Sequence, residues 1–174
     1  SYHINSDLLE IIRIDMIFEN ANPNLKIVGT NKKNSYLNFY NLSNGKELTK
    51  TPTYNQIKYQ NIYKDIDLIV YDNNGELEYD FILNPGAYPS DIKLKLEGTE
   101  NYLIDEKGNL QIENQFSKVI KEKPICFQII NNEKVSVNSQ YSIENGQITF
   151  EIGEYVSSKT LVIDPIVRLL GSYY

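Results

Sequence analysis

The chain of 174 residues has one cysteine, one histidine and no tryptophan. Because Cys126 is alone, no disulfide can form within the chain, and a hydrophobic core must hold the fold together. A single histidine, His3, far from Cys126 in sequence, gives little support to a Cys-His or Ser-His-Asp site and excludes the usual zinc site within this chain. Cys126 lies in an apolar run, so we interpret it as a packed strand thiol rather than a nucleophile.

Long apolar runs and basic clusters are also absent. No run approaches the roughly 20 apolar residues of a membrane-spanning helix, so we expect no membrane insertion. Residues 1–5 have neither the basic segment nor the apolar core of a signal peptide. The 17 basic residues, against 23 acidic ones, occur in short groups such as Lys32-Lys33. Phosphate binding needs clustered Lys and Arg, so nucleic acid is not expected as a partner.

The main positive signal is a series of short β-rich runs separated by turn residues. In residues 92–96, Ile92, Leu94 and Leu96 alternate with two lysines, which is typical of a strand with one buried and one wet face. In residues 76–83, Leu77, Tyr79, Phe81 and Leu83 alternate with Glu78, Asp80 and Ile82. The expected strands are 10–18, 26–28, 35–40, 57–63, 66–71, 76–83, 92–96, 102–104, 110–113, 119–121, 125–130, 134–137, 141–144, 147–152 and 161–163.

Asparagine and glycine mark the turns between these runs. The chain has 21 Asn residues, and Asn145-Gly146 stands where a two-residue type I′ hairpin needs positive φ twice. Asn73-Asn74-Gly75 lies between two strands, and Asn131-Asn132 is expected to form a looser loop. No apolar stripe of helical period persists for ten residues. The sequence therefore predicts an all-β, antiparallel domain with two packed sheets, like a β-sandwich.

An acidic region in the middle of the chain is the best candidate for chemistry. It could bind calcium through oxygen ligands, but its spacing does not match an EF-hand loop, and we favour solvated strand and turn carboxylates. The same acids could serve a glycoside hydrolase, yet the sequence singles out no pair. Whether calcium binds stays open. The acidic residues are Asp65, Asp67, Asp72, Glu76, Glu78 and Asp80.

Tyrosine is the most common aromatic residue of the chain. Tyrosines suit half-buried strand positions, so cross-strand packing is our first interpretation, while an exposed row of rings that binds sugars is the alternative. No Gly-rich phosphate loop occurs. We therefore assign no catalytic, cofactor-binding or metal-ligating residue and expect no cofactor. The tyrosines concerned are Tyr54, Tyr59, Tyr63, Tyr71, Tyr79 and Tyr88.

Several segments, in order, resemble a known but uncharacterised domain. It precedes SBBP-type β-propeller repeats in very large secreted bacterial proteins, often in Bacteroidota with type IX secretion. The resemblance implies an exported, modular protein at the cell surface, with roles in adhesion or surface assembly, and no catalytic residue to carry over. The matching segments are 13–18, 21–23, 51–54, 57–59, 61–63, 65–71, 77–87, 123–124, 153–155 and 161–165.

Together these observations predict one all-β domain over residues 1–165, lacking strands at its N-terminal end. Residues 166–174 would begin the connection to downstream repeats. We expect a non-catalytic structural or interaction module of an adhesin-like surface protein, outside the cell or on its surface. Its partners would be other domains of the same polypeptide, other surface proteins or glycans. The alternatives are a carbohydrate-binding module with exposed tyrosines and, third, a carboxylate-based hydrolase.

Overall fold

The computed structural model describes residues 13–40, 47–114 and 118–165, and it confirms an all-β, antiparallel, sandwich-like fold. The expected features at residues 1–12 and 166–174, including His3 and the connection to repeats, lie outside the described residues. The elements are β1 (Asp15–Phe18), β2 (Lys26–Tyr40), β3 (Glu47–Tyr63), β4 (Ile66–Asn73), β5 (Glu76–Leu83), η1 (Pro89–Asp91), β6 (Leu94–Glu97), β7 (Asn101–Ile104), β8 (Leu110–Glu113), β9 (Lys118–Lys121), β10 (Ile125–Ile130), β11 (Glu133–Val137), β12 (Ser139–Glu144), β13 (Gln147–Ile152) and β14 (Leu161–Asp164).

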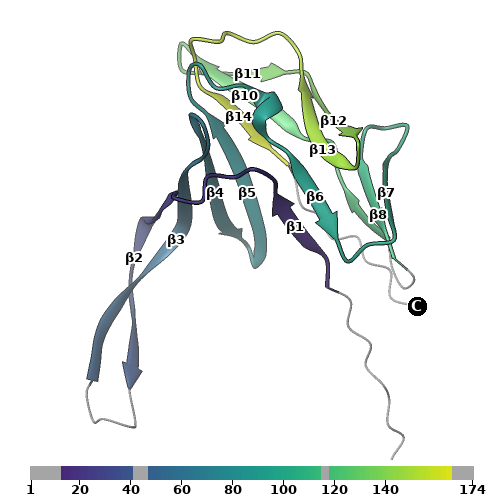
Figure 1. Ribbon diagram of the computed structural model, residues 1–174. Helices are drawn as coiled ribbons and strands as arrows, with labels where there is room; N and C mark the ends of the chain where they lie inside the picture. Colours follow the sequence, from purple (N-terminus) through teal and green to yellow (C-terminus); the bar gives the residue numbers. More distant parts are fainter. Residues whose placement is uncertain (1–12, 41–46, 115–117, 166–174) are drawn as a thin grey trace, which may run out of the picture.

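The strands form three sheets (Figure 1). Sheet A has the order β1-β6-β13-β12, and sheet B has the order β11-β10-β14-β5-β4-β3-β2. The sequence predicted two packed sheets without assigning strands to either, and the structure has a third one, sheet C, with the order β7-β8-β9. Every strand pair in the described part of the chain is antiparallel.

The core is built by the apolar faces that the two-residue period predicts. Phe81 in β5 is fully buried, and its ring makes edge contacts with Phe18 of β1 and Phe150 of β13, at centroid distances of 6.1 and 5.8 Å. Ile92 and Leu94 are buried as expected. Since Phe18 and Phe150 belong to sheet A and Phe81 to sheet B, these rings join the two sheets.

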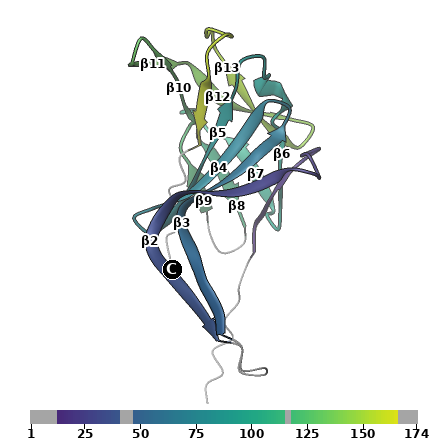
Figure 2. The ribbon, with the colours of Figure 1, turned by 90° about the vertical axis from the view of Figure 1, so that its left-hand side faces the viewer.

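The strands β2 and β3 are longer than the sequence predicts. The expected runs 26–28 and 35–40 are parts of the single strand β2, and β3 begins at Glu47 rather than Ile57. Before Gln56, β3 pairs with β2 alone, since the β3–β4 register starts at Gln56. Figures 1 and 2 show this two-stranded hairpin extending past the ends of the other strands. The sequence did not predict the full strands because residues 29–34 show no apolar alternation, which a strand needs only where one face is packed.

Asparagine sets three two-residue hairpin turns, at residues 74–75, 131–132 and 145–146. Asn145 and Gly146 have φ values of 51° and 75°, as the type I′ turn requires. The link from β10 to β11, expected to be loose, is equally tight: Ile130 pairs with Glu133, and the two asparagines between them have φ values of 52° and 65°. Asparagine tolerates the left-handed region better than most non-glycine residues, which explains a tight turn without glycine.

The loop between β13 and β14 is held by one buried amide. Gln128 of β10 accepts a hydrogen bond from the Val156 N–H at 2.8 Å. Its Nε2 donates to the carbonyl oxygens of Val156, Lys159 and Thr160, at 2.9, 3.2 and 3.4 Å. Gln128 is 1% exposed, so water cannot replace these bonds.

Replacing Gln128 with leucine is expected to destabilise the fold by about 3 kcal/mol, because the loop would lose every hydrogen bond that its backbone makes with this buried amide. Urea unfolding followed by circular dichroism measures this cost. Gln140→Leu is the matched control, since its side chain is exposed and bonds only to Glu151; it should change stability by less than about 0.5 kcal/mol. Equal costs for the two variants would contradict the role of Gln128.

Candidate functional site

A polar groove lies beside β13, where the pairing between β13 and β6 ends. β13 pairs with β12 along its whole length, from Gln147 to Ile152. On its other edge it pairs with β6 only at Ile148, opposite Leu94. Beyond that point the short helix η1 lies beside β13 in place of a paired strand. In the part of the chain that the structure describes, the edge of β13 after Ile148 has no hydrogen-bonded strand partner.

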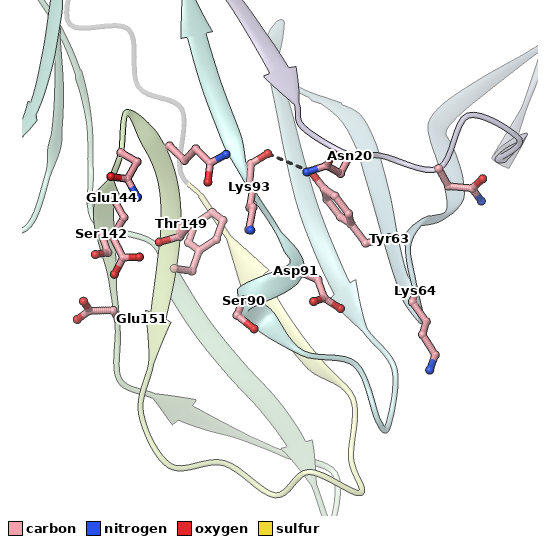
Figure 3. Close-up of a pocket in the computed structure, with 14 residues that line it drawn as sticks. Asn20, Tyr63, Lys64, Ser90, Asp91, Lys93, Ser142, Glu144, Thr149 and Glu151 are labelled. Atoms are coloured by element: carbon pink, nitrogen blue, oxygen red, sulfur yellow. Dashed lines mark hydrogen bonds between the residues drawn. The ribbon is translucent and has the colours of Figure 1, made fainter.

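The groove has a volume of about 860 Å³ and is lined by side chains from several elements. Figure 3 shows Ser142, Glu144, Thr149 and Glu151 on the side of β12 and β13, with Ser90 and Asp91 on η1. Amides, hydroxyls and charges of both signs line it, so it offers many hydrogen-bond donors and acceptors. The full lining is Asn20, Asn22, Tyr63, Lys64, Ser90, Asp91, Lys93, Ser142, Glu144, Asn145, Gln147, Thr149, Phe150 and Glu151.

Two buried aromatic residues support the groove from the core. The Tyr63 hydroxyl donates to the Lys93 carbonyl oxygen at 3.1 Å, and burial raises the pKa of Tyr63 to about 12. Phe150 stacks on the core through Phe81 and Tyr141. The Gln147 side chain donates to the Glu19 carboxylate, which ties the start of β13 to the end of β1. These contacts fix the backbone on both sides of the groove.

A bulge in β3 positions the wall that carries Tyr63 and Lys64. The β3–β4 register shifts between Tyr59 and Tyr63, and Asn61 has a φ of 52°. The Asn61 N–H donates to Asp67 Oδ1 at 2.8 Å, and Lys58 Nζ lies 2.7 Å from Asp67 Oδ2. Burial alone would raise the pKa of Asp67, but Lys58 and the Asn61 N–H lower it below its usual value. Asp67 therefore stabilises the bulge.

Three more acids of the predicted calcium region have separate structural partners, whereas Asp65 lies in the turn between β3 and β4 with a φ of 58° and Glu76 is exposed at the start of β5. Asp72 accepts a hydrogen bond from the Gly75 N–H in the β4–β5 turn. Glu78 accepts one from Asn73, and Asp80 one from the Tyr71 hydroxyl. Within residues 13–40, 47–114 and 118–165, no three or more His, Cys, Asp or Glu residues are arranged to hold a metal ion.

The tyrosines lie mostly in packed positions. Tyr63 is buried, and Tyr59, Tyr71 and Tyr79 are partly buried. Tyr54 in β3 and Tyr88 before η1 are exposed, on different elements. The structure thus brings no row of exposed rings together from the six named tyrosines, although Tyr63 reaches the groove.

Cys126 is buried in β10, as expected, and burial raises the pKa of its thiol to about 11. A raised pKa keeps the thiol protonated and poorly reactive. No helix among the described residues has the length and apolarity that crossing a membrane requires.

Sequence reasoning did not find the groove. Its lining comes from four separate stretches, residues 20–22, 63–64, 90–93 and 142–151, and no stretch carries a motif. One local signal was present: Pro89 follows the strand-breaking segment 84–88 and starts η1, which displaces the chain from the edge of β13.

Comparison with known proteins places the chain in a family. No curated protein and no solved structure matches it. The model of the family described as Domain of unknown function (DUF7948) matches residues 2–166, which is nearly the whole chain. The chain therefore belongs to the DUF7948 family.

Proposed function

We propose that the domain is a non-catalytic interaction module of a large exported bacterial surface protein, and that its groove receives an extended segment of a partner polypeptide. The observation that carries this proposal is the edge of β13, which lines the groove and has no strand partner beyond Ile148 among the described residues. Unpaired strand edges bind extended chains through their main-chain N–H and C=O groups. The surface context rests on the resemblance to the domain that precedes SBBP-type repeats.

The groove lining supports the same function. An extended polypeptide presents alternating donors and acceptors, and the groove offers Asn, Gln, Ser and Thr side chains that can meet both. Lys64 and Lys93 stand with Asp91, Glu144 and Glu151 in the lining. Because the charges are mixed, the groove favours a polar partner of low net charge over a polyanion. Another domain of the same polypeptide or a second surface protein fits this description.

A carbohydrate is the second candidate ligand. Its many hydroxyl groups would also match the amide, hydroxyl and carboxylate side chains of the lining. This binding mode differs from the exposed row of tyrosines that the sequence suggested, since the sugar would lie in the groove rather than over Tyr54 or Tyr88.

The test is a parallel screen of the folded domain against a random peptide display library and a glycan array. Filling the groove with Ser90→Trp or Ser142→Trp should weaken binding of selected peptides at least 10-fold, measured by calorimetry. Ser158→Trp, exposed in the β13–β14 loop outside the groove lining, is the matched control and should bind normally.

The outcomes separate the candidates. Peptide binding that both groove variants lose supports the polypeptide partner, and glycan binding lost in the same way supports the carbohydrate. Binding that survives both groove variants, or no binding in either screen, would overturn the proposal.

A further inference from the structure

The hairpin of β2 and β3 lacks the support that the other strands have. Residues 30–40 and 47–55, called the arm here, form two strands that pair with no third strand among the described residues. They project from the body in both views (Figures 1 and 2). A two-stranded ribbon by itself is only marginally stable in water. The arm therefore gains stability from any surface that covers it.

The arm and its base expose apolar side chains. Leu37 of β2 is 55% exposed, and Ile27 and Ile57 at the base are 58% and 43% exposed. The Tyr54 ring, also exposed, lies over Gly29, where an added Cβ would come within 2.5 Å of it. Exposed apolar side chains thus occur along the hairpin, and contact with another surface would remove them from water.

The charge of this hairpin is opposite to that of the rest of the chain. Of 17 basic and 23 acidic residues, β2 and β3 hold five and one, which leaves 12 and 22 elsewhere. Lys58 is paired with Asp67 of its own chain, whereas Lys32, Lys33 and Lys50 lie in the arm itself. Lys32 and Lys33 are exposed on β2. The natural partner of a basic, partly apolar hairpin is an acidic, partly apolar surface.

The outer face of sheet B is such a surface. Glu76, Glu78 and Asp80 alternate with the inward residues of β5, so their side chains share the face turned away from the core. Asp164 of β14 alternates with buried Ile163 and lies close enough to act on the charge of Asp80.

Exposed isoleucines adjoin these carboxylates. Ile125 of β10 is the cross-strand partner of Asp164 and is 43% exposed, and Ile129 on the same strand is 53% exposed. Burial and the negative charges of Asp164 and Glu78 raise the pKa of Asp80 to about 6, and Lys134 is the cation that acts against this shift. An additional cation on this face would relieve the repulsion among its carboxylates.

We propose that the arm of one copy of this chain docks on the outer face of sheet B of a second copy. Lysines of the arm meet the carboxylates of β5 and β14, and Leu37 and Tyr54 of the arm cover Ile125 and Ile129. Two copies can exchange arms reciprocally, which closes a two-fold symmetric dimer. This association is separate from the groove and goes beyond the proposed function.

Sedimentation velocity and light scattering of the full chain test the proposal. At 50 mM salt the mass should rise with concentration toward twice the 20.1 kDa of one chain, and 500 mM salt should weaken association at least 10-fold because it screens the charges. The double variant Lys32→Glu, Lys33→Glu should be monomeric, and so should Glu76→Lys, Glu78→Lys. Circular dichroism checks that each variant is folded.

The decisive experiment mixes the two charge-reversed variants. The acidic arm of the first complements the basic face of the second, so the mixture should associate although neither variant does alone. Lys107→Glu, Lys159→Glu is the matched control, with two exposed loop lysines outside the arm, and should associate like the natural chain. A natural chain that stays monomeric at low salt, a mixture that stays monomeric, or a control that dissociates equally would overturn the proposal.

Discussion

Replacing Phe81 with alanine is expected to lower the free energy of unfolding by about 4 kcal/mol, the cost typical of a buried phenylalanine. The Phe81 ring lies between the sheets, with Phe18, Tyr79 and Phe150 at centroid distances of 6.1, 5.8 and 5.8 Å. Removing it leaves a cavity that rings from both sheets line, and these rings cannot all move to fill it.

Leu77→Ala is the matched control for this variant. Leu77 lies on the same strand, and its position alternates on the same face, but it is 68% exposed. Its loss should cost less than about 1 kcal/mol. Urea unfolding of the two variants gives both values, and similar costs would show that the sheets do not pack through Phe81.

The second large effect concerns a lysine buried between sheets. Lys121 at the end of β9 is 5% exposed, and its ammonium donates to the Tyr79 hydroxyl at 2.9 Å. Burial lowers the pKa of Lys121 to about 8 from 10.5. Between about pH 8 and pH 10.5, Lys121 is protonated in the unfolded chain and neutral in the folded chain. The contribution of Lys121 to the free energy of unfolding therefore rises with pH. Below about pH 8 the buried ammonium is charged, and its burial lowers the free energy of unfolding by on the order of 3 kcal/mol.

Lys121→Met should therefore stabilise the fold at pH 7, by about 2 kcal/mol after the Tyr79 hydroxyl loses its partner. This advantage should shrink by about 1 kcal/mol between pH 7 and pH 9, as the natural chain releases the proton. Urea unfolding of both proteins at the two pH values measures the difference between their free energies of unfolding. Other titrating groups, such as Cys126, contribute equally to both proteins and cancel. A methionine variant less stable at pH 7, or a difference independent of pH, would contradict this account of Lys121.

Two-residue periodicity predicted the packed strands well. The bounds of β8, β10 and β13 agree with the expected ranges, because each strand has one face in the core and one in water. The same reasoning failed for the arm, which pairs with no third strand in the described part of the chain and whose residues 29–34 show no alternation. It also failed to predict sheet C as a separate sheet, since pairing partners are chosen by the whole fold and not by one strand.

The candidate site was beyond sequence reasoning for a different reason. Sequence proximity grouped Asp67 with Asp80, whereas the structure uses Asp67 in the β3 bulge and brings Asp80 close to Asp164. The groove likewise depends on where β13 and β6 separate, after their single paired position at Ile148. Such long-range juxtapositions follow from strand order, which the pattern of any one strand does not encode.

Amide hydrogen exchange of β13 tests the central claim most directly. A peptide selected from the display screen should slow the exchange of edge amides between Thr149 and Ile152 and leave the hairpin β4–β5 unchanged. Protection that appears only outside the groove, with the β13 amides exchanging as before, would show that this strand edge is not where the domain binds its partner.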